Sequence, residues 1–144
     1  MTLHRGKKYS EKHQQKDIAD PIIKNYILHR DKNSKISCAE AFDIARELNT
    51  PVDRIGITID LLDIKLTKCQ LGLFGYKPKK KLLKPSNLTG PDLKDDISKA
   101  LDKGRLSCKR AWDISSRFNV DKITVSSTCE FLGIKINDCQ LGAF

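Results

Sequence analysis

The chain has 144 residues, a formal net charge of +9 and five cysteines. No stretch is apolar and long enough to cross a membrane, and the first residues lack the apolar segment of an export signal. We therefore expect a cytoplasmic protein with free thiols and no membrane partner, built from one average domain or two small ones.

An internal repeat decides in favour of two domains. Residues 35–74 align without a gap with residues 105–144, and both copies end in the pattern CQLGxF. A repeated unit keeps the residues that its fold needs and varies where function can diverge. The sequence predicts a basic tail at 1–17, a first repeat at 18–75, a basic linker at 76–87 and a second repeat at 88–144.

Each repeat is predicted to contain three helices and one short strand, which makes the protein mainly α-helical. Pro21 and Pro91 suit the first turn of the first helix, since this turn does not use the amide hydrogen that proline lacks. The second helix is expected to begin after Ser37, which forms the capping-box pattern with Glu40. The second repeat keeps the serine but has Arg110 in place of the glutamate, so half of the box is lost.

A tight turn and a third helix follow in each repeat. Asn49 and Asn119 come directly after the second helix, and asparagine tolerates the left-handed backbone of such a turn. Thr50 and Pro51 predict the cap and the first position of the third helix in the first repeat. Alternating apolar residues then predict a short strand at 64–66, with its counterpart in the second repeat.

The second and third helices carry a pattern of their own. A small residue on the inner face of the second helix, Ala45 or Ser115, is followed ten positions later by an apolar residue, Ile55 or Val125, so that the two helices can cross closely. This pattern resembles the helix-turn-helix of winged-helix domains over about 40 residues of each repeat. The resemblance implies two tandem winged-helix-like domains, although one short strand replaces the usual two-stranded wing. The CQLGxF ends resemble those of small proteins of anaerobic microbes, which implies no activity.

Binding of double-stranded DNA is the leading functional hypothesis, with a role in transcriptional regulation as one form of it. The third helix of such a domain reads DNA, and in the second repeat its outer face offers short polar side chains and a base. The expected DNA-contacting residues of this helix are Lys122, Thr124, Ser126, Ser127 and Thr128. The linker adds phosphate-binding lysines with no acid among them, namely Lys77, Lys79, Lys80, Lys81 and Lys84.

A protein-interaction or scaffold module without nucleic acid is the alternative hypothesis. In the first repeat the third helix offers acids and two aliphatic residues, Ile57 and Leu61, and Phe131 occupies the position of Leu61 in the second repeat. Acids repel DNA, whereas apolar residues on an outer face mark an interface. The first repeat is therefore expected to bind a protein partner or to form a homodimer.

Four cysteines are repeated, and three interpretations of them stay open. Cys38 and Cys69 are matched by Cys108 and Cys139, without any closely spaced pair. Buried structural cysteines are the favoured interpretation, since zinc needs four ligands and the two repeats would have to pool theirs. A redox-active pair is the third possibility, because Cys38 and Cys108 are expected at helix starts, where the helix dipole lowers a thiol pKa.

The sequence contains no pattern typical of catalysis. It has no Ser/His/Asp arrangement and no glycine-rich phosphate loop. The repeated acids, Asp43 and Asp113, follow an aromatic residue on the second helix, where a structural role is common. We expect neither an enzyme nor a cofactor.

Overall fold

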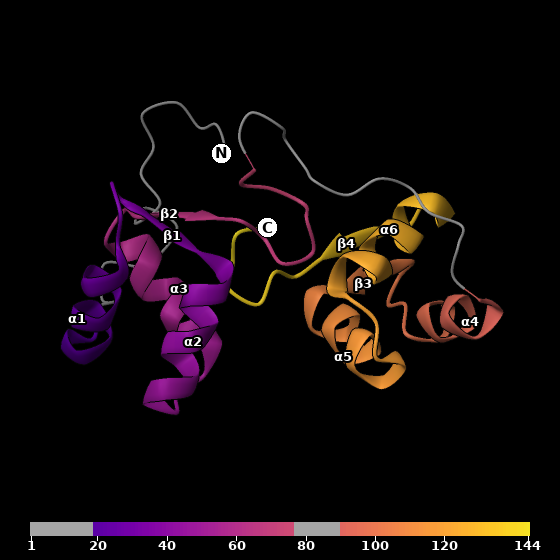
Figure 1. The fold of residues 1–144 in the computed structure, drawn as a ribbon, viewed down its shortest axis with the longest axis horizontal. Coiled ribbons are helices and arrows are strands. Elements are labelled where there is room, and N and C mark those ends of the chain that lie inside the picture. The colour runs from indigo at the N-terminus through magenta and orange to yellow at the C-terminus, as the bar shows by residue number, and fades with distance from the viewer. Residues whose placement is uncertain (1–18, 77–89) are drawn as a thin grey trace. The chain divides into compact units, whose positions relative to one another are not determined.

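The computed structural model describes residues 19–76 and 90–144 (Figure 1). In these ranges the protein is mainly α-helical and forms two compact units. Unit 1 consists of residues 19–68 with the short segment 141–143, and unit 2 consists of residues 69–76, 90–140 and Phe144. Each unit is therefore built mainly from one of the two sequence repeats.

Both units contain the same succession of helix, strand, helix, helix and strand. In unit 1 the elements are α1 (Pro21–Arg30), β1 (Lys35–Ser37), α2 (Cys38–Leu48), α3 (Val52–Leu61) and β2 (Lys65–Thr67). In unit 2 they are α4 (Pro91–Lys99), β3 (Arg105–Ser107), α5 (Cys108–Phe118), α6 (Lys122–Leu132) and β4 (Lys135–Asn137). The three helices predicted for each repeat are present.

The prediction of one strand per repeat is incomplete, because each unit has a pair of strands. β1 and β2 pair in parallel, with Lys35 opposite Lys65 and Ser37 opposite Thr67, and β3 and β4 pair in the same way. A parallel pair needs a long connection, which α2 and α3 supply in unit 1. The wing of a winged helix is a hairpin, and in the described residues no antiparallel hairpin of named strands follows α3 or α6.

A two-residue turn leads from α1 into β1. Lys32 and Lys35 exchange backbone hydrogen bonds of 3.0 and 3.1 Å around Asn33 and Ser34, whose φ angles are 53° and 60°. Two successive left-handed residues are the backbone of the turn that suits a two-residue reversal. Unit 2 repeats this turn around residues 103–104, so both first strands start in the same way.

The helix ends form largely as the sequence predicts. Ser37 and Glu40 make both bonds of the capping box, at 3.1 and 3.2 Å, while Ser107 only accepts a hydrogen bond from the backbone of residue 110. Asn49 and Asn119 have the expected left-handed backbone after α2 and α5. These caps fix the lengths of the second helices and hence the close turn into the third.

The core of unit 2 is apolar and contains two of the repeated cysteines. Its buried members come from all three helices, from β3 and from the closing segment of the first repeat, and they are Cys69, Leu71, Leu93, Ile97, Leu106, Cys108, Ala111, Ile114, Val125 and Cys129. Unit 1 buries the residues at the matching positions of its helices, including Ile23, Ile27, Ala41, Ile44 and Ile55. The apolar stripes read from the sequence are therefore the core positions.

The closing CQLG segments determine where the two units end. Leu141 belongs to unit 1, where an ideal Cβ on Gly56 of α3 would lie 2.1 Å from the Leu141 carbonyl oxygen. Leu71 belongs to unit 2, where the Ser126 hydroxyl of α6 donates a 2.6 Å hydrogen bond to the Leu71 carbonyl oxygen. The compact units therefore differ at their ends from the predicted repeats 18–75 and 88–144.

Candidate functional site

The polar face expected on α6 is not exposed, which corrects the DNA-reading prediction for three of its residues. Ser126, Ser127 and Thr128 are all buried. The Ser126 hydroxyl bonds to the carbonyl oxygen of Leu71, and the Thr128 hydroxyl donates to the backbone carbonyl oxygen of Thr124 at 2.8 Å. The Ser126 and Thr128 hydroxyls therefore make hydrogen bonds within unit 2 and cannot contact the base edges of DNA.

The other residues expected to contact DNA are either half-buried or lie outside the described residues. Lys122 and Thr124 are half-buried at the start of α6. The Lys122 ammonium lies 4.5 Å from the centroid of the Trp112 ring, a cation–π contact that holds this base against its own unit. The linker lysines, Lys77, Lys79, Lys80, Lys81 and Lys84, lie outside the described residues.

The residues expected at a protein interface on the third helices are partly exposed. Ile57 and Phe131 are exposed, whereas Leu61 is half-buried. The Lys94 ammonium lies 5.4 Å from the centroid of the Phe131 ring, so this aromatic already has a contact in unit 2. Ile57 of unit 1 is exposed, and its role at a protein interface stays a prediction.

A larger group of exposed apolar side chains lies on α1, where the sequence-based predictions named no site. Ile22, Tyr26 and Leu28 expose 62%, 40% and 46% of their surface, respectively. They flank the buried stripe of Ile23 and Ile27, which attaches α1 to unit 1. The outer side of α1 is therefore an apolar surface on a helix whose inner side is already packed.

The matching helix of unit 2 is polar on its outer side. α4 buries Leu93 and Ile97, the counterparts of Ile23 and Ile27. The positions of Ile22, Tyr26 and Leu28 are occupied there by Asp92, Asp96 and Ser98. This difference was visible in the sequence, because PIIKNYILHR has apolar residues around the whole helix and PDLKDDISK has them on one stripe.

A pocket of about 340 Å³ lies beside the apolar side chains of α1. Asn25, Tyr26, His29 and Arg30 of α1 line it together with Glu47 of α2. The His29 Nδ1 atom lies 2.8 Å from the Asn25 carbonyl oxygen, which keeps the ring close to its own helix. The pocket thus combines an aromatic wall with a charged rim.

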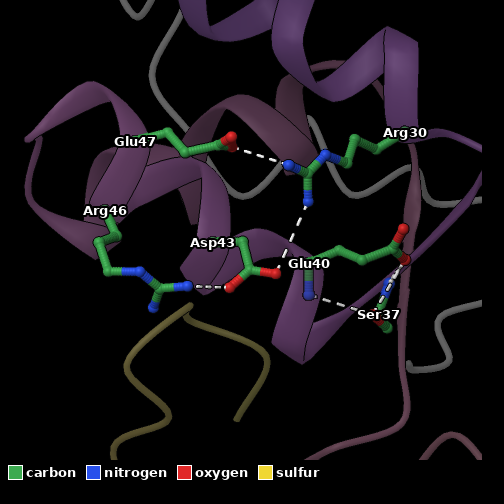
Figure 2. A network of polar contacts seen from close by, with 6 residues as sticks. All are labelled: Arg30, Ser37, Glu40, Asp43, Arg46 and Glu47. Carbon is green, nitrogen blue, oxygen red and sulfur yellow. Dashed lines mark hydrogen bonds and ion pairs between the residues drawn. The ribbon is translucent and has the colours of Figure 1, made fainter.

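Ion pairs fix the charged rim of this pocket (Figure 2). Arg30 bonds to Glu47 through Nη2 and Oε2 at 2.7 Å, and its Nη1 atom lies 3.7 Å from Oδ2 of Asp43. Arg46 pairs with the other oxygen of Asp43. All four side chains are partly exposed, so these pairs add little stability, but they orient Arg30 across the α1–α2 boundary.

The repeated cysteines are mostly buried thiols. Cys69 and Cys108 lie in the core of unit 2, and the Cys108 sulfur accepts a 3.4 Å hydrogen bond from Nε2 of Gln140. Burial raises the thiol pKa of both residues, so the lowered pKa expected for Cys108 at the start of α5 is wrong. Cys38 is also buried, and Cys139 is half-buried. Within residues 19–76 and 90–144, no three His, Cys, Asp or Glu side chains are arranged to hold a metal ion.

Comparison with models of known families, with curated proteins and with solved structures finds no match to this chain. Among the described helices, none has the length and apolar character that crossing a bilayer requires.

Proposed function

We propose that this protein is a protein-interaction module and that its binding surface is the outer face of α1, formed by Ile22, Tyr26 and Leu28. The comparison of α1 with α4 carries the proposal, because two helices of the same origin differ at these three surface positions. When a partner fully covers an exposed aliphatic or aromatic side chain, the burial stabilises the complex by about 1.5–3 kcal/mol for each side chain. The adjacent pocket suits an anchoring side chain of that partner.

We expect the fold of unit 1 not to depend on these apolar residues. α4 packs on unit 2 through the same two buried positions while it carries the exposed Asp92 and Ser98 and a half-buried Asp96 that pairs with Arg117. Grouped apolar side chains on the outer side of a helix usually mark an interaction surface. The outer face of α1 therefore gains its full stabilisation only when a partner covers it.

In this proposal, α2 and α3, whose sequence resembles a helix-turn-helix, act as a scaffold for α1. Ala45 and Ile55 are both buried where α2 and α3 meet, and Asn49 makes the left-handed turn between them. We propose that this helix-turn-helix-like core presents α1 as a rigid ligand-binding helix. Unit 1 has the parallel pair of β1 and β2 and differs in this from the two-stranded wing of the winged-helix domains that the sequence resembles.

A photo-reactive amino acid placed at two matched positions tests the proposal. Asn25 and Asp95 are counterparts, and both are exposed. In the full chain inside its native cells, a probe at position 25 should cross-link to protein on illumination, and a probe at position 95 should not. Absence of any protein adduct at position 25, or equal adducts at both positions, contradicts the proposed function.

The charge distribution favours double-stranded DNA as a second candidate partner. Residues 75–90 contain five lysines and no acid, so they can bind phosphate without reading sequence. We propose this as non-specific binding through the linker, because three of the expected base-reading residues of α6 are buried. The salt-dependence experiment in the Discussion tests it.

A further inference from the structure

We infer that each repeat supplies the closing segment of the other unit, and that the two repeats therefore bind each other and stay together when the linker between them is cut. The closing segments are the CQLGxF ends, 69–74 and 139–144. Three features of the structure support this exchange: the unit to which each segment belongs, the equivalence of the two contacts that hold the segments, and the burial of the exchanged residues. The exchange is independent of the proposed binding surface on α1.

The closing segments belong to units that are built mainly from the opposite repeat. Residues 69–74 end the first repeat and are part of unit 2, whereas residues 141–143 end the second repeat and are part of unit 1. A repeat that folded by itself would place its closing segment on its own helices. Each repeat is instead both the donor and the receiver of such a segment.

The two exchanged segments are held at equivalent places. Gly56 and Ser126 are counterparts on the third helices, and Leu71 and Leu141 are counterparts in the closing segments. In unit 1 a Cβ on Gly56 would lie 2.1 Å from the Leu141 carbonyl oxygen, and in unit 2 the Ser126 hydroxyl donates a 2.6 Å hydrogen bond to the Leu71 carbonyl oxygen. The same backbone atom meets the same helix position twice, which indicates that the exchange is a property of the repeat.

The exchanged residues fill the cores of the units that receive them. Leu71 exposes 0% of its surface and Leu141 exposes 4%. Cys69 is buried with Leu71 in the core of unit 2, and Phe74 packs against that core. Domains of about 60 residues bury only about 60% of the surface of their unfolded chains, so the loss of a core segment is severe for them. Each unit therefore needs the segment from the other repeat.

A cut in the linker would divide the chain into two fragments, and neither would contain a complete unit. After a cut between Pro85 and Ser86, the fragment 1–85 has the helices of unit 1 and the closing segment of unit 2. The fragment 86–144 has the helices of unit 2 and the closing segment of unit 1. The partner that completes each fragment is thus the other fragment.

Cleavage of the folded full chain tests the exchange. A recognition sequence for a site-specific protease, inserted between residues 85 and 86, allows this cut. After complete cleavage, both fragments should elute together in size-exclusion chromatography at the volume of the uncut chain. Cys69 should react with a thiol reagent as slowly as in the uncut chain, as followed by mass spectrometry, because it stays buried in unit 2. Fragments that separate, or a Cys69 that reacts as fast as in urea, overturn the exchange.

Leu71→Ala and Leu28→Ala are matched variants of the fragment 1–85. Both changes remove the same atoms from a leucine, but Leu71 is buried in unit 2 and Leu28 is exposed on α1. Leu71→Ala should raise the dissociation constant of the two fragments roughly ten-fold or more, measured by sedimentation equilibrium over a range of dilutions. Leu28→Ala should leave this constant unchanged. Equal effects of the two changes would show that other contacts hold the fragments together and would overturn the exchange.

A second pair of variants covers the case in which Leu71→Ala prevents folding of the uncut chain, as seen by circular dichroism. Ser126→Ala removes only the hydroxyl that binds the Leu71 carbonyl oxygen, and Ser116→Ala makes the same change at an exposed position of α5. Ser126→Ala should raise the dissociation constant of the fragments several-fold, and Ser116→Ala should not change it. A constant that both changes leave unaltered contradicts the contact between the closing segment 69–74 and α6.

Discussion

The carbonyl oxygen of Leu141 occupies the space into which any side chain at Gly56 would grow. Gly56 is inside α3, where glycine is normally unfavourable, so its presence reflects the close approach of this backbone. At the matching place in unit 2, the Ser126 hydroxyl bonds to the carbonyl oxygen of Leu71. One closing segment is thus held by close packing and the other by a hydrogen bond.

Substitution of Gly56 by alanine should destabilise the protein, although the same change in an ordinary helix stabilises it by about 0.5–1 kcal/mol. The new methyl group meets backbone that cannot move without displacing residues 141–143, so we expect a loss of about 1–3 kcal/mol. Urea unfolding followed by circular dichroism measures the difference. A variant as stable as the wild type, or more stable, contradicts the contact between Gly56 and Leu141.

Ser126→Ala should also destabilise, by about 1 kcal/mol, because the buried Leu71 carbonyl oxygen loses its hydroxyl partner. Ser116→Ala, at an exposed position of α5, serves as the control and should change the free energy of unfolding by less than about 0.5 kcal/mol. Equal effects of the two changes in urea unfolding would show that the bond to Leu71 contributes nothing.

The buried thiols should make stability depend on alkaline pH. Burial raises the pKa of the Cys129 thiol from 9.0 to about 11. Between these values the unfolded chain releases the proton and the folded chain keeps it, so the free energy of unfolding falls as pH rises. Cys129→Ala should make this fall shallower between pH 9 and 11, as measured by urea unfolding at several pH values. An unchanged pH dependence contradicts a protonated, buried Cys129.

The linker lysines should dominate any affinity for duplex DNA. Each phosphate neutralised adds about 0.9 to the slope of log affinity against log salt. Replacement of Lys77, Lys79, Lys80, Lys81 and Lys84 by glutamine should therefore flatten that slope, measured by fluorescence anisotropy with a labelled duplex. The same measurement on Ser126→Ala should give the wild-type slope. A slope that the five changes leave unaltered places the DNA contact elsewhere or removes it.

Local signals made much of the fold predictable from the sequence. Ser37 and Asn49 act through hydrogen bonds and backbone angles that depend on a few neighbouring residues, so their roles could be read directly. β1 was missed because three residues in front of a helix cap are too few to show alternation. Thr50 was expected to cap α3, but Pro51 occupies that position and α3 begins one residue later.

The surfaces were harder to predict, because they depend on residues distant in sequence. Helical periodicity identifies the side of α6 that contains Val125, but it cannot reveal that Leu71 covers Ser126. The exposure of Ile22 and Tyr26 had a usable signal, namely the loss of both apolar residues in the second repeat. That signal appears only when the two first helices are compared position by position, since the alignment of the repeats is weakest there.

The most direct test of the account measures cross-linking from position 25 after the outer face of α1 has been made polar like that of α4. The triple change is Ile22→Asp, Tyr26→Ser and Leu28→Ser, in which positions 22 and 28 receive the residues of the second repeat. Serine is used at position 26 because the aspartate of the second repeat pairs with Arg117, whereas unit 1 has Glu47 at the matching position. With the photo-reactive probe at position 25, we expect protein adducts to disappear while the helix content and the thermal unfolding midpoint remain close to those of the wild type. Adducts that persist at the same yield would contradict an interaction surface on α1, and loss of the fold would show that these side chains serve stability instead.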